Sequence, residues 1–68
     1  MQTDETEVVR AGDLAVGDLV LRVGLTGAAW REVAAVELLE LDVLRVEFAG
    51  DAPRRYLSGS TFSRRVEL

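Results

Sequence analysis

The 68-residue sequence contains no cysteine and no histidine, and all eight of its basic residues are arginine. Without cysteine, neither a disulfide nor a thiolate metal site can stabilise the fold. Without histidine, the commonest general base is absent, and the serines lack the usual partner for activation as nucleophiles. The aspartates do not show calcium-loop spacing, and no glycine-rich loop is followed by a lysine that holds phosphate. We therefore expect a protein that is not an enzyme, with no cofactor, no metal and no small-molecule substrate.

Long apolar runs are also missing. None reaches the roughly 20 residues of a membrane-spanning helix. The first residues, MQTDETE, lack the apolar segment of a signal peptide. We therefore expect a cytoplasmic protein with no membrane partner. Nearly half of the residues (49%) are apolar, which argues against disorder.

A chain of this length forms one small domain, whose core is marginal unless it is well packed or shared with a partner. Residues 1–7 are polar and acidic, and we expect them to form a flexible tail. Short apolar strands then alternate with turn signals roughly every eight to twelve residues. This pattern predicts an all-β fold over residues 8–68, a small barrel of five or six strands.

The densest concentration of large apolar residues lies at 30–48. Residues 44–48 alternate apolar and charged side chains, as a half-buried strand does. Before them, the alternation is restored by a bulge between Val33 and Val36. Residues 31–41 also fit a helix with one apolar face, which would give an α+β fold. We favour a hairpin bent at 39–42, because its second arm has a clear strand pattern.

One resemblance supports the barrel. The order Ala-Gly-Asp-Leu, Val-Gly-Asp, Trp-x-x-Val, x-Val-x-Phe-x-Gly-Asp, Arg-x-Tyr and Arg-Arg-Val resembles small SH3-like β-barrel proteins of actinobacteria and their phages. The resemblance covers roughly residues 8–68, and its motifs are turn and core positions. It implies an SH3-like barrel fold and brings no functional residues to carry over.

The proposed bend contains a surplus of apolar residues. Consecutive apolar residues at a strand end cannot all point into one small core. Either a helix or a bent hairpin folds them over an open barrel end, or they form an exposed patch of the kind that marks protein contacts. We expect a non-catalytic interaction module, such as a phage or accessory protein, that binds a protein partner or forms a homo-oligomer. The expected contact residues are Leu38, Leu39, Leu41 and Val43.

A second hypothesis comes from the uneven charge. Residues 1–53 carry a balance of −7 and residues 54–68 a balance of +3, which together give the net charge of −4. Arginines bind phosphates and aromatic rings stack on bases, so the basic segment is an alternative nucleic-acid site. Its residues are Arg54, Arg55, Tyr56, Arg64 and Arg65.

Two arguments weaken the nucleic-acid hypothesis. Strand alternation sends the two members of each arginine pair to opposite faces. The negative net charge also reduces non-specific affinity for a polyanion. The competing interpretation is that these arginines pair across strands with Glu32, Glu37 and Glu47.

Overall fold

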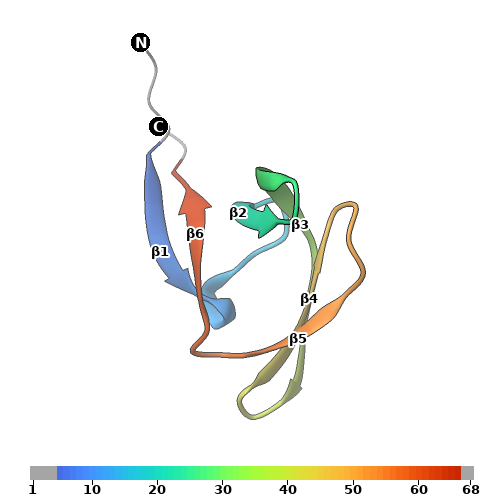
Figure 1. The fold of residues 1–68 in the computed structure, drawn as a ribbon. Helices are drawn as coiled ribbons and strands as arrows, with labels where there is room; N and C mark the ends of the chain where they lie inside the picture. Colours follow the sequence, from blue (N-terminus) through green and yellow to red (C-terminus); the bar gives the residue numbers. More distant parts are fainter. Residues whose placement is uncertain (1–4, 67–68) are drawn as a thin grey trace.

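The structure is a computed structural model that describes residues 5–66. Within this range the chain forms one sheet of antiparallel strands in the order β1-β6-β2-β3-β4-β5 (Figure 1). The strands are β1 (Thr6–Arg10), β2 (Leu19–Gly24), β3 (Gly27–Glu40), β4 (Val43–Phe48), β5 (Arg54–Leu57) and β6 (Thr61–Arg65). A single 3-10 turn at Ala11–Asp13 follows β1. The prediction of an all-β fold is confirmed.

The sheet curls along its length. The edge strand β5 pairs only with β4, yet the short turn at 58–60 leads the chain straight into β6, between β1 and β2. Figure 1 shows this connection running below β2, from the end of β5 to the start of β6. The connection therefore links the two halves of the sheet, while the edge strands β1 and β5 do not pair with each other among the described residues. This curvature gives the sheet an inner face, on which the apolar core collects.

The first strand begins earlier than the sequence predicted. Thr6 and Glu7, expected in the flexible tail, pair with Arg65 and Arg64 of β6. The backbone N–H of Val66 also donates to the carbonyl of Glu5 over 2.9 Å. Residues 1–4 of the expected tail and residues 67–68 of the expected domain lie outside the described residues.

The helix alternative at 31–41 is wrong, because these residues lie in β3 and the turn after it. The ladder between β3 and β4 shifts register between Val33 and Ala35, so the predicted bulge is confirmed. It lets both Val33 and Val36 face β4 residues of the inner face, Phe48 and Val46. The turn falls at 41–42, inside the predicted bend.

No helix among the described residues is long and apolar enough to cross a membrane.

The core is small and lies on the inner face. Among the described residues, no buried polar side-chain atom lacks a hydrogen-bond partner. The buried members are Ala11, Leu14, Val20, Val33, Leu44, Val46, Phe48 and Phe62. Phe62 connects its aromatic part: its ring centroid lies 6.1 Å from that of Phe48 and 5.1 Å from that of Tyr56, the latter edge-on. Both separations are favourable for aromatic pairs.

Replacing Phe62 tests how far the fold depends on this aromatic cluster. Phe62→Ala should cost roughly 3–5 kcal/mol, which is comparable to the whole stability of so small a domain. Phe62→Leu refills most of the volume and should cost about 1 kcal/mol. Urea unfolding followed by circular dichroism measures both, with the exposed neighbour in Thr61→Ala as control. Equal midpoints for Phe62→Ala and Thr61→Ala would contradict the packing described.

Candidate functional site

The bend between β3 and β4 divides its apolar residues between core and solvent. Leu44 is buried, with 6% of its surface exposed, and lies opposite Leu38 in the ladder. Leu38 and Leu41 expose 67% and 90% of their surfaces. Leu39 and Val43 are half-buried. The four predicted contact residues therefore lie around the bend, and none of them is buried in the core.

A further leucine joins them from β5. Leu57 exposes 64% of its surface and lies opposite Val43 in the ladder between β4 and β5. The N–H of Ser58 donates to the carbonyl of Asp42 over 2.8 Å, which ties the end of β5 to the bend. Sequence reasoning missed Leu57 because only the strand pairing brings it to the bend. We use the name apolar tip for Leu38, Leu39, Leu41, Val43 and Leu57.

The structure separates the residues of the predicted nucleic-acid segment. Arg54 and Tyr56 lie on the inner face, opposite Val46 and Leu44. Arg55 lies on the outer face, directly opposite Arg45 of β4. In β6, the backbone partners of Arg64 and Arg65 are Glu7 and Thr6 of β1. Alternation therefore splits both arginine pairs, and the segment does not form one continuous basic surface.

Arg64 is part of an ion-pair network between strands. Its Nε donates to Glu7 Oε1 over 2.9 Å, its Nη2 contacts the same oxygen, and its Nη1 donates to Asp18 Oδ2 over 3.2 Å. The hydrogen bond to Glu7, and then that to Asp18, raises the pKa of Arg64. The predicted partners Glu32, Glu37 and Glu47 are wrong for this residue, since the carboxylates come from β1 and from the segment before β2.

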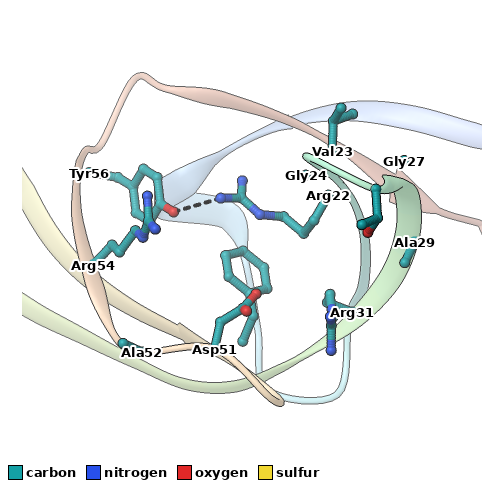
Figure 2. A pocket seen from close by; sticks show the side chains of 12 residues that line it. Arg22, Val23, Gly24, Gly27, Ala29, Arg31, Asp51, Ala52, Arg54 and Tyr56 are labelled. Carbon is teal, nitrogen blue, oxygen red and sulfur yellow. Dashed lines mark hydrogen bonds between the residues drawn. The ribbon is translucent and has the colours of Figure 1, made fainter.

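Other arginines line a pocket of about 240 Å³ on the inner face of the sheet (Figure 2). Its charged side chains are Arg22 of β2, Arg31 of β3, Arg54 of β5, and Asp51 of the loop after β4. Phe48 and Tyr56 supply aromatic surface. Sequence reasoning had assigned Arg54 and Tyr56 to a binding segment, but it missed Arg22 and Arg31.

Arg22 reaches across this pocket toward Tyr56, as Figure 2 shows. Its Nη2 donates to the Tyr56 hydroxyl oxygen over 2.9 Å. The guanidinium carbon lies 4.7 Å from the ring centroid of Phe48, and 5.7 and 5.6 Å from those of Tyr56 and Phe62. These distances fall within the range of cation–π attraction. Arg22 is therefore fixed over the aromatic end of the core.

Arg31 is held by the loop between β4 and β5. Its Nη1 donates to the carbonyl of Ala49 over 3.3 Å. Gly50 has a φ of 86°, a conformation that disfavours other residues. A Cβ at Gly50 would also lie 2.6 Å from Nη1 of Arg31, so the end of that flexible side chain would have to shift. The positive φ at the turn therefore accounts for glycine at this position, and the missing Cβ leaves room for the guanidinium of Arg31.

Comparison with family models, with curated proteins and with solved structures finds no match to this chain. Within residues 5–66, no group of three carboxylates is placed to hold a metal ion.

The Arg64 network predicts a measurable loss of stability. Arg64→Met keeps the aliphatic stem but removes both ion pairs, and it should cost about 1 kcal/mol because the groups are partly exposed. Arg55→Met makes the same change of charge where no ion pair exists among the described residues, and it should change stability by less than about 0.5 kcal/mol. Urea unfolding at low salt measures both variants. A difference that persists undiminished at high salt would argue against an electrostatic origin.

Proposed function

We propose that the chain is a non-catalytic interaction module that binds another protein chain through the apolar tip. The observation that carries this proposal is the exposure of Leu38, Leu41 and Leu57 around a bend in which only Leu44 is buried. Burying a leucine side chain contributes about 1.5–3 kcal/mol, so burying these leucines against a partner would substantially favour association. A second copy of the chain is the first partner to test.

The position of the tip supports a protein partner. β5 is an edge strand, and its exposed Leu57 lies beside the bend. A partner can therefore cover the leucines and also add a strand along β5. Exposed apolar patches on small soluble domains are typical of protein contact sites.

We also propose that the curled sheet is an SH3-like barrel. Two features support this assignment: β2 pairs with both β3 and β6, and β5 and β6 follow one another through a short turn. Through this turn the chain passes from β5, an edge strand that pairs with β4, to β6, which pairs with β1 and β2. The fold assignment supports no particular activity.

Leu41→Asp tests the apolar tip directly. The side chain is exposed, so the monomer should stay folded, whereas a charge in a buried interface should weaken association about tenfold or more. Light scattering across a tenfold range of concentration measures self-association, with circular dichroism as the check on folding. Leu25→Asp is the matched control, because Leu25 is fully exposed at the opposite hairpin turn, between β2 and β3.

A dimer lost in Leu41→Asp but kept in Leu25→Asp would support self-association through the tip. If the chain is a monomer, the same two variants test binding to a candidate protein partner. A complex that is equally stable in both variants would contradict the proposal. Unfolding of Leu41→Asp would show that the tip belongs to the core.

Nucleic-acid binding stays as the alternative prediction, favoured by the position of Arg54 and Tyr56 on the same face of β5. It predicts affinity for a single-stranded oligonucleotide that falls steeply as salt rises, because bound counterions are released. Replacing Arg54 and Arg65 with alanine should lower that affinity further. Fluorescence anisotropy over a salt series measures it, and the absence of binding at low salt would end this alternative.

A further inference from the structure

We propose that the pocket lined by Arg22, Arg31 and Arg54 binds a compact oxyanion, that is, a carboxylate or phosphate group carried by a small ligand. This site is separate from the apolar tip and does not rest on the function proposed for it.

The pocket has an excess of positive charge. Three guanidinium groups line it against one carboxylate, that of Asp51. Among the described residues, none of the three arginines forms an ion pair, whereas Arg64 has two carboxylate partners. The concentration of unpaired arginines occurs in a chain whose net charge is −4. A local positive site within an acidic protein favours an anionic group.

The pocket also has more hydrogen-bond donors than acceptors. A guanidinium carries five N–H donors and no acceptor. Arg22 donates to Tyr56, whose hydroxyl oxygen serves there as acceptor, so the phenolic proton is left to be donated elsewhere. The side chain of Arg54 has no hydrogen-bond partner among residues 5–66. The planar fork of arginine matches the paired oxygens of carboxylate and phosphate, and such bonds are stronger than neutral ones.

Two of the three arginines are held in place before any ligand arrives. The rings of Phe48, Tyr56 and Phe62 surround the guanidinium of Arg22. The loop at Ala49–Gly50 holds the guanidinium of Arg31. Binding therefore orders little more than Arg54, which lowers the entropic cost of capture. The apolar rings also exclude water from one side of Arg22, which strengthens its attraction for an anion.

The size of the site selects a compact group. A volume of about 240 Å³ is smaller than the roughly 300–1,000 Å³ of pockets for larger ligands. A long polyanion would also meet the acidic remainder of the surface, which repels it. A single carboxylate or phosphate enters the pocket without that penalty.

The experiment is a titration of the full ¹⁵N-labelled chain, followed by NMR at constant ionic strength. Inorganic phosphate and glutarate are the probes, and an oligodeoxythymidylate is the polyanionic comparison. Saturable shifts are expected at the Arg22 side-chain N–H and at the Gly50 amide. Arg54→Gln should weaken the binding about tenfold, since a charge-assisted hydrogen bond is lost. The matched control is Arg55→Gln, the same charge change one residue away on the opposite face, which should alter affinity less than about twofold.

Tighter binding of phosphate than of glutarate assigns the pocket to phosphoryl groups, and the reverse order assigns it to carboxylates. The proposal is overturned if neither probe gives a saturable shift at the pocket, or if Arg54→Gln and Arg55→Gln weaken binding equally. It is also overturned if the oligonucleotide alone binds and both substitutions weaken it, because that result indicates a nucleic-acid surface. Failure here leaves the apolar tip unaffected, since its test uses other residues.

Discussion

Successive side chains of a β-strand point to opposite faces, and this constraint decides which residues share the inner face of the curled sheet. In β2 it places Arg22 on the face of the buried Val20, and in β3 it places Arg31 on the face of the buried Val33. In β5 it places Arg54 on the face of Tyr56, which packs against the core. The core and the arginine pocket are consequently two parts of one surface. Each arginine lies two positions along its strand from a residue that belongs to the core or packs against it.

The aromatic residues join these two parts. Phe48 and Phe62 are buried in the core, and their rings also contact the guanidinium of Arg22. A charge at the end of a small core is tolerated because the rings attract it and the Tyr56 hydroxyl accepts one of its N–H groups. The apolar tip lies where the core no longer reaches: Leu44 is the last residue of the bend to be buried. The sheet thus has a polar region, the arginine pocket, on its inner face and an apolar region at the bend between β3 and β4.

Much of the fold followed from the sequence, because turn residues and alternation are local signals. The bulge between Val33 and Val36 was predictable, since both are apolar and an odd spacing cannot otherwise keep them on one face. The early start of β1 was not, because the ion pair of Glu7 with Arg64 joins opposite ends of the chain. The arginine pocket was not predictable from the sequence either. In β2 both faces carry apolar residues, so the sequence does not reveal that the face with Arg22 is the inner one.

NMR of the side chains tests whether Arg22 lies on the inner face against the aromatic rings. In that position the Arg22 side chain should give nuclear Overhauser contacts to the rings of Phe48 and Phe62. The same position also predicts upfield ring-current shifts relative to Arg55, which lies on the outer face. Random-coil shifts for Arg22, with no contact to either ring, would contradict the inner face described and with it the arginine pocket.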